Sequence, residues 1–125
     1  MDDRRQFVRL DTRLEISYSV LPAGTAQDSV TKNISGGGVC LFADHTLAQG
    51  TPLQVSMTLP GRKEPVQFTG EVVWSEAYEL IGPERRERRV EVGVKFVKIA
   101  PKDQEAVLQH VILRIRGQPP ISRQQ

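Results

Sequence analysis

The sequence is poor in cysteine and has no long apolar run, and each scarcity excludes a class of protein. The single cysteine, Cys40, excludes an internal disulfide, and no paired Cys/His spacing of a zinc site is present. No apolar run approaches the length that crosses a bilayer, and the charged start MDDRRQFVRL lacks the apolar segment of a signal peptide. We therefore expect a soluble domain in a reducing, cytoplasmic compartment.

The chain also has little excess charge of either sign, since 17 basic and 15 acidic residues leave a net charge of +2. This balance does not indicate a bulk nucleic-acid binder. Twelve of the 17 basic residues are arginines, whose planar fork suits phosphates and guanine edges. They gather in two clusters, Arg4, Arg5, Arg9 and Arg13 near the N-terminus and Arg85, Arg86, Arg88 and Arg89 farther along. Glu84 and Glu87 interleave with the second cluster, which we expect to be a solvated, partly self-neutralised hairpin loop.

The chain also lacks the pattern of a catalytic site. His45 and His110 are far apart and have no motif partner, and Cys40 is expected to pack in the core in the middle of a strand. The acidic residues are scattered without a paired arrangement. Because no nucleophile accompanies a base and an orienting group, we predict no enzyme activity, no metal and no cofactor.

Apolar residues alternate with polar ones over most of the chain, which is typical of half-buried strands. We predict six strands, over residues 13–20, 28–34, 38–43, 53–59, 66–75 and 89–97. The period through Val72 assigns Trp74 to the core side of its strand, and residues 76–87 are expected to form a loop. Residues 101–116 instead space their apolar positions as a helix with one apolar stripe.

Six antiparallel strands followed by one helix indicate a single domain of the mainly β class. The expected architecture is a closed six-stranded antiparallel β-barrel covered by the C-terminal helix. We expect this domain over residues 13–117, an N-terminal arm over residues 1–12, and a flexible tail over residues 118–125.

The stretch NISGGG, Asn33 to Gly38, carries three consecutive glycines after an Asn and a Ser. A phosphate loop of the P-loop kind needs a Lys-Ser/Thr pair and then a helix. Here an expected strand follows, so a turn between two strands is predicted instead. The glycines permit a positive φ and omit the Cβ atom, which allows close approach to the backbone.

Two short motifs combine arginines and small polar residues in a fixed order, Arg5-x-x-x-Arg9 and then Asn33-x-Ser35-x-x-Gly38. Together with GEVVW (70–74) and VGVKF (92–96), they make the chain resemble the PilZ domain family from about residue 4 to residue 116. The resemblance implies a six-stranded antiparallel barrel with a C-terminal helix. It also implies a bacterial receptor module for the second messenger cyclic di-GMP.

The resemblance further implies which residues bind the ligand. Arginine forks fit the O6/N7 edge of guanine and also bind phosphate, which makes the arm residues candidates, namely Arg4, Arg5 and Arg9. The turn would supply hydrogen-bonding groups and backbone clearance through Asn33, Ser35, Gly36, Gly37 and Gly38. Trp74 is a further candidate for lining the pocket, although its expected position favours core packing. In the family an Arg just before the first motif accompanies an intercalated ligand dimer, so Arg4 implies two ligands per site.

The implied role is that of an adaptor, in which the ligand orders the arm and the rearranged surface engages a protein effector. Motility, polysaccharide synthesis and gene regulation are all compatible with it, and neither a nucleic-acid partner nor membrane insertion is expected. Two alternatives stay open. In the first, the chain is a family member that acts through protein contacts without binding cyclic di-GMP. In the second, which the sequence favours less, it is a small barrel that binds single-stranded nucleic acid. The second needs interleaved aromatics, and the chain has only seven, four Phe, two Tyr and one Trp.

Overall fold

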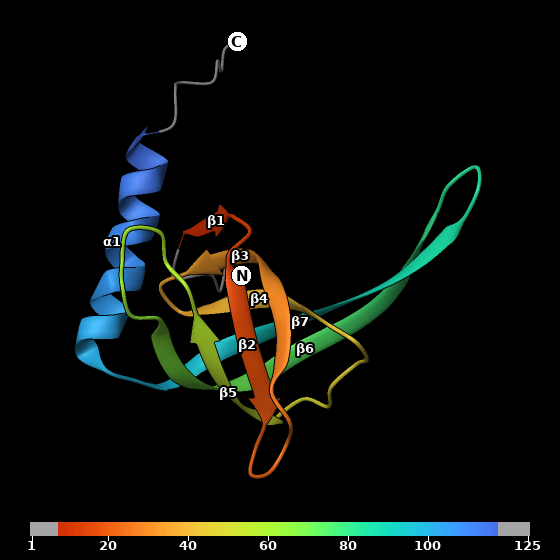
Figure 1. Ribbon diagram of the computed structural model, residues 1–125, viewed down its shortest axis with the longest axis horizontal. Helices are drawn as coiled ribbons and strands as arrows, with labels where there is room; N and C mark the ends of the chain where they lie inside the picture. Colours follow the sequence, from red (N-terminus) through yellow and green to blue (C-terminus); the bar gives the residue numbers. More distant parts are fainter. Residues whose placement is uncertain (1–7, 118–125) are drawn as a thin grey trace, which may run out of the picture.

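The computed structural model describes residues 8–117 and contains seven strands followed by one helix (Figure 1). In chain order these are β1 (Arg9–Asp11), β2 (Glu15–Val20), β3 (Gln27–Ser35), β4 (Gly38–Ala43), β5 (Pro52–Met57), β6 (Val66–Ile81), β7 (Arg86–Ile99) and α1 (Pro101–Gly117). Strand β1 lies inside the stretch that was expected to be an arm. The predicted strands and helix are otherwise all present.

Strands β2 to β7 close into a barrel. The order along the sheet is β1-β3-β2-β5-β6-β7-β4, and the additional pairing of β3 with β4 completes the ring. Strands β1 and β2 share one edge of β3, since β1 pairs with its C-terminal half and β2 with its N-terminal half. The predicted six-stranded antiparallel barrel with a C-terminal helix is therefore confirmed, with β1 as one extra strand.

Alternate strand positions fill the barrel with apolar side chains, as the sequence period predicts. The largest of those with almost no exposure are Phe68, Ile34, Leu41, Leu53 and Met57. Phe68 also meets Phe96 edge to face, with 4.6 Å between the ring centroids. Each such burial contributes roughly 1.5–3 kcal/mol to folding.

Helix α1 packs against β1, β3 and β6. Its apolar stripe buries Val107 and Val111 against the barrel. In its first turn, Asp103 accepts hydrogen bonds from the Arg62 guanidinium at 2.9 Å and from the Gln67 amide at 3.3 Å. Across residues 8–117, no helix is both long and apolar enough to cross a membrane.

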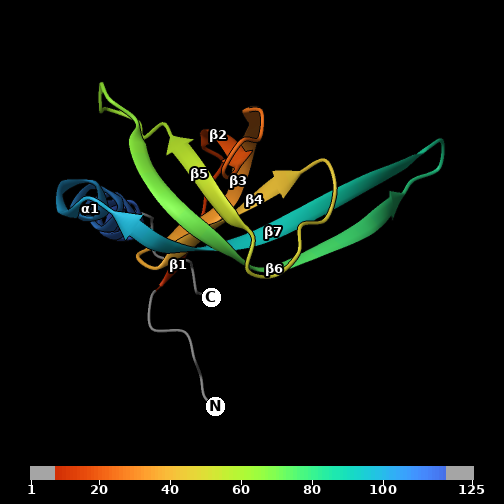
Figure 2. The same ribbon diagram turned by 90° about the horizontal axis from the view of Figure 1, so that it is seen from below.

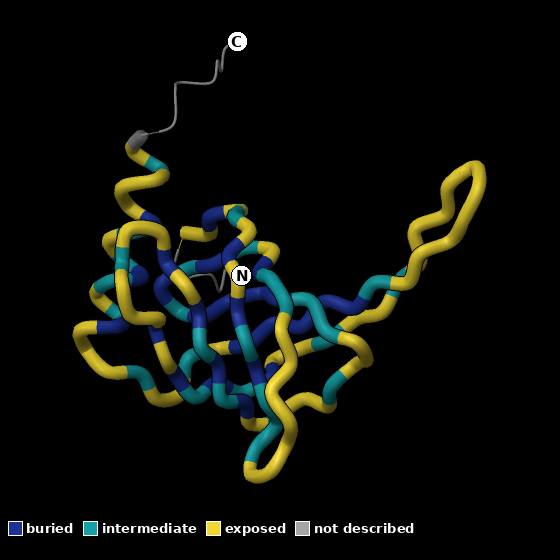
Figure 3. Tube along the Cα trace, viewed as in Figure 1, coloured by how far each residue is buried: buried dark blue, intermediate teal, exposed yellow. Residues whose placement is uncertain are grey.

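The predicted loop over residues 76–87 is wrong, because these residues continue β6 and β7 as a long two-stranded hairpin. The hairpin projects well beyond the barrel in two perpendicular views (Figures 1 and 2). Its outer residues are exposed on both faces (Figure 3), so their charged composition looks like that of a loop. Pairing across the strands, with Glu79 opposite Arg88 and Glu79 3.8 Å from the Arg86 guanidinium, favours the extended ladder.

The assignment of Trp74 to the core is also wrong, because a β-bulge interrupts the period of β6. The register shifts between Val72 and Trp74. Val72 is fully buried, Val73 takes up the extra position, and Trp74 is 39% exposed opposite Gly93. A bulge reverses the face of every later residue in a strand, so the indole lies on the outside of the barrel.

Candidate ligand-binding site

The described end of the arm, residues 8–12, and the NISGGG turn meet on the outside of the barrel. Strand β1 pairs with the end of β3, which places Arg9 opposite Ser35 and Asp11 opposite Asn33. Between these pairs, Leu10 and Ile34 are buried in the core and hold β1 in place. Because strand side chains alternate between faces, Arg9, Asn33 and Ser35 project outward together. The other two predicted arginines, Arg4 and Arg5, lie outside the described residues.

The glycine turn is closed by its own serine. The Ser35 hydroxyl accepts a hydrogen bond from the Gly37 amide at 3.1 Å and donates to the Gly38 carbonyl at 3.4 Å. The Gly37 carbonyl accepts from the Phe96 amide at 2.9 Å, and the Gly36 carbonyl accepts from the Gln104 side chain at 3.5 Å. The turn is thus tied to both β7 and α1.

The glycines of this turn do not adopt the positive φ that the sequence suggested. Within residues 8–117, only Gly50 and Gly61 do so. Gly38 is needed for a different reason, since a Cβ atom there would overlap the backbone oxygen of Val94 in β7. The missing Cβ at Gly38 therefore makes room for the neighbouring strand.

A single row of residues crosses the outer face from the arm to the base of the hairpin. Its members are paired strand by strand, in the order Asp11, Asn33, Cys40, Gly93 and Trp74. The indole of Trp74 lies where a Cβ atom of Gly93 would be. Strands are spaced about 4.8 Å apart, so Asn33 and Trp74 are about 14 Å apart along the sheet. The row thus places an aromatic side chain on the same outer face as Asn33.

Cys40 is buried, as predicted, but on this face and not with the core residues Val39 and Leu41. Burial, reinforced by the charge of Glu91, raises the pKa of the Cys40 thiol to about 11, although Lys32 and Arg9 act in the opposite direction. The thiol is therefore protonated at neutral pH and is not a nucleophile.

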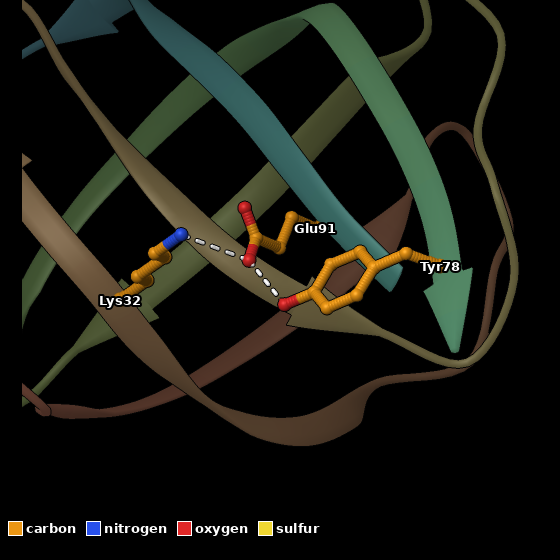
Figure 4. A network of polar contacts seen from close by, with 3 residues as sticks. All are labelled: Lys32, Tyr78 and Glu91. Carbon is orange, nitrogen blue, oxygen red and sulfur yellow. Dashed lines mark hydrogen bonds and ion pairs between the residues drawn. The ribbon is translucent and has the colours of Figure 1, made fainter. Parts of the chain in front are cut away.

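A polar network that the sequence did not reveal lies beside this row (Figure 4). The Lys32 ammonium donates to Glu91 at 2.9 Å, and the Tyr78 hydroxyl donates to the same carboxylate oxygen. Burial alone would raise the pKa of Glu91, but these two hydrogen bonds outweigh it and hold the pKa below its ordinary value. A charged residue between Val90 and Val92 in an alternating strand looks like any outward position, so no sequence signal marked it.

Comparison with known proteins assigns the family. The sequence model of the PilZ domain family matches residues 3–113 of this chain. This chain belongs to the PilZ family. Both PilZ motifs named above fall within the matched range, and the PilZ barrel described here brings Arg9 of the first beside Ser35 of the second.

Solved structures similar to this PilZ domain include the Bacillus subtilis inhibitor of motility MotI/DgrA, at 25% identity and a TM-score of 0.72 over 94% of this chain and 54% of that one. The PilZ domain of Escherichia coli YcgR, solved with c-di-GMP, is 13% identical with a TM-score of 0.72 over 91% and 93% of the two chains. The K. pneumonia MrkH–c-di-GMP complex is 19% identical with a TM-score of 0.69 over 93% and 55%. The chain spans about half the length of MotI and MrkH. No curated protein matches it significantly.

Proposed function

We propose that this PilZ domain is a receptor for cyclic di-GMP and binds it on the outer face of the barrel, between the arm and the glycine turn. The pairing of Arg9 with Ser35 carries the proposal, because it joins the two motifs on one side of the sheet. The related structures of YcgR and MrkH, both solved with c-di-GMP, support the same ligand.

The chemistry of the face suits a cyclic dinucleotide with two phosphates and two guanines. The Arg9 guanidinium offers two parallel donors to a phosphate or to the O6/N7 edge of guanine. The Asn33 amide both accepts and donates, which suits the mixed edge of guanine. Arg4 and Arg5 add further guanidinium groups from the arm, and the backbone of Gly36 to Gly38 borders the ligand.

Trp74 supplies the aromatic surface at the other end of the row. Its indole is 39% exposed and lies against Gly93, so one ring face is supported by the sheet. Stacking on such a ring contributes about 1–3 kcal/mol per base in nucleic-acid complexes. One guanine therefore stacks on Trp74 while the phosphates reach Arg9. Arg4 gives the site a capacity for two intercalated ligand molecules.

Signalling in this proposal depends on the arm. The ligand bridges the arm and the barrel, orders the residues that carry Arg4 and Arg5, and changes the surface offered to a protein effector. Ordering of the arm lowers the affinity below what the contacts alone would provide. We expect a dissociation constant on the order of micromolar, or about 8 kcal/mol of binding free energy. No catalytic step is required.

Titration calorimetry with cyclic di-GMP tests the proposal. Wild-type protein should bind with micromolar affinity and a stoichiometry near two. Arg9→Ala should cost about 2–5 kcal/mol of binding free energy, since it leaves ligand charge unpaired. Arg88→Ala is the matched control, because Arg88 pairs with Glu79 on the exposed hairpin, on the face opposite Tyr78.

No heat from wild-type protein at tens of micromolar ligand would refute the receptor function. The chain would then be a PilZ domain that works through protein contacts alone. Salt-dependent binding of an RNA oligonucleotide by the same sample would instead favour the single-stranded nucleic-acid alternative.

A further inference from the structure

Lys32 stands at the border between the ligand row and the base of the hairpin. It precedes Asn33 directly, at a register shift of β3 that leaves it without a partner on β4. Its side chain is 48% exposed, whereas that of Glu91 is 11% exposed. The 2.9 Å contact between them thus joins a half-exposed cation to a largely buried carboxylate.

We propose that Lys32 is a further phosphate-binding residue of this face, and that Glu91 competes with the ligand for it. The inference rests on the proposed cyclic di-GMP site and extends it to a residue outside both motifs. Without an anion the Lys32 ammonium stays on Glu91. When a phosphate binds beside Asn33, the ammonium moves to the phosphate.

The flexibility of lysine makes this exchange feasible. The ammonium is a compact charge on a four-carbon stem and has three rotatable donors. Lys32 is close enough to the site for its charge to act on the Cys40 thiol together with that of Arg9. Cys40 in turn pairs with Asn33 across the strands, so the ammonium has only a short distance to cover.

Tyr78 lowers the free-energy cost to the Glu91 carboxylate of losing Lys32. Its hydroxyl donates to the same Glu91 oxygen that Lys32 contacts, so a released Glu91 keeps one strong hydrogen bond. A largely buried carboxylate without any partner would be costly. The network can therefore lose its cation while the carboxylate keeps a hydrogen bond, although its negative charge is then no longer neutralised by Lys32.

Glu91 also sets the affinity of the site. Binding a dianion draws Lys32 away and leaves an uncompensated negative charge beside the ligand, which opposes binding. Removal of the Glu91 charge should free Lys32 in advance and tighten binding. Removal of Lys32 should weaken binding, and more so when Glu91 no longer competes for it.

A double-mutant cycle on the full chain tests this. Cyclic di-GMP affinity is measured by calorimetry for wild type, Lys32→Met, Glu91→Gln and the double variant, and Trp74, the single tryptophan, gives a fluorescence signal from the site. We expect Lys32→Met to weaken binding about tenfold and Glu91→Gln to tighten it several-fold. The loss caused by Lys32→Met should be larger in the Glu91→Gln background, and Lys32→Arg should restore near-wild-type affinity.

Lys63→Met and Glu64→Gln, in the exposed turn between β5 and β6, are the charge-matched controls and should leave affinity unchanged. Thermal melts of each variant show that the barrel is intact, and Lys32→Met, at a half-exposed position, decides the matter even if Glu91→Gln is less stable. Binding by wild type with an unchanged affinity in Lys32→Met overturns this inference alone. If Lys32→Met lowers the affinity equally in the wild-type and the Glu91→Gln backgrounds, Glu91 does not compete with the ligand for Lys32. Absence of binding by wild type overturns the receptor function itself, and the inference with it.

Discussion

Trp74 on β6 lies across Gly93 on β7, and its indole fills the space that a Cβ atom at position 93 would need. The pair forms the far end of the row that begins at the arginine arm. Because Trp74 is the single tryptophan, its emission reports on this surface without interference.

The Gly93→Ala variant should displace the indole from the sheet. The new methyl group would overlap a half-exposed ring, which can swing toward solvent, so the expected cost to folding is below about 1 kcal/mol. We expect a red-shifted Trp74 emission and a several-fold weaker affinity for cyclic di-GMP. Gly82→Ala, where a methyl group would meet only ordinary contacts, is the control. An unchanged emission maximum in Gly93→Ala would contradict the placement of the indole.

The main effect of the Gly38→Ala substitution should be a loss of folding stability, with any loss of ligand binding as a consequence. Its methyl group would overlap the Val94 carbonyl and crowd the Lys95 Cα atom, and neither backbone group can move without disturbing β7. We expect a loss of about 1–3 kcal/mol in the free energy of unfolding, measured by urea denaturation. Weak ligand binding by this variant would then reflect a damaged barrel. Wild-type stability would show that β4 and β7 are not packed this closely.

The Asp103–Arg62 pair should make stability depend on pH in the acid range. Burial alone would raise the pKa of Asp103, but hydrogen bonds from Arg62 and from the Gln67 amide outweigh it and lower the pKa below 3.8. A carboxyl with a depressed folded pKa stabilises the protein above its unfolded pKa, and the contribution is lost as pH falls through the folded value. Asp103→Asn should therefore cost about 1–3 kcal/mol at pH 7.

Urea denaturation of Asp103→Asn and wild type at several pH values checks the sign. The difference between the two proteins should be constant from pH 7 to about pH 5 and shrink below about pH 4. Glu105→Gln, two residues along the same helix and exposed, should show no such difference. If the difference in unfolding free energy between Asp103→Asn and wild type instead widens in acid, the lowered pKa of Asp103 is not its cause.

The hairpin beyond Tyr78 should be dispensable for folding. Every residue from Glu79 to Arg88 is exposed, and none belongs to the core. Replacement of this segment by Asn-Gly, which favours a two-residue turn between paired strands, should keep the melting temperature within a few degrees. Ligand affinity should also persist, because Tyr78, Arg89 and Glu91 remain. A large loss of stability would mean that the hairpin supports the barrel.

Much of the fold was predictable because burial alternates locally along each strand. The residues of β2 and β5 show their inner face in the sequence itself, and the helical spacing of Val107 and Val111 marks α1. Two of the failures have one cause each. A bulge at Val73 reverses the face of Trp74, and the charged residues 76–87 pair as strands although their composition is typical of a loop. Local composition indicates neither the position of a bulge nor the identity of a cross-strand partner.

The sequence by itself determined the barrel, the helix and the two PilZ motifs, because these depend on the order and period of neighbouring residues. Only the tertiary structure decided that Arg9 faces Ser35, that Gly38 clears β7, and that Trp74, Lys32 and Glu91 share the outer face with Asn33. The physical reason is that strand register and closure bring together residues that are far apart in the chain, 59 positions in the case of the Lys32–Glu91 contact. Such distances are set by backbone pairing across the whole barrel, which no local pattern records.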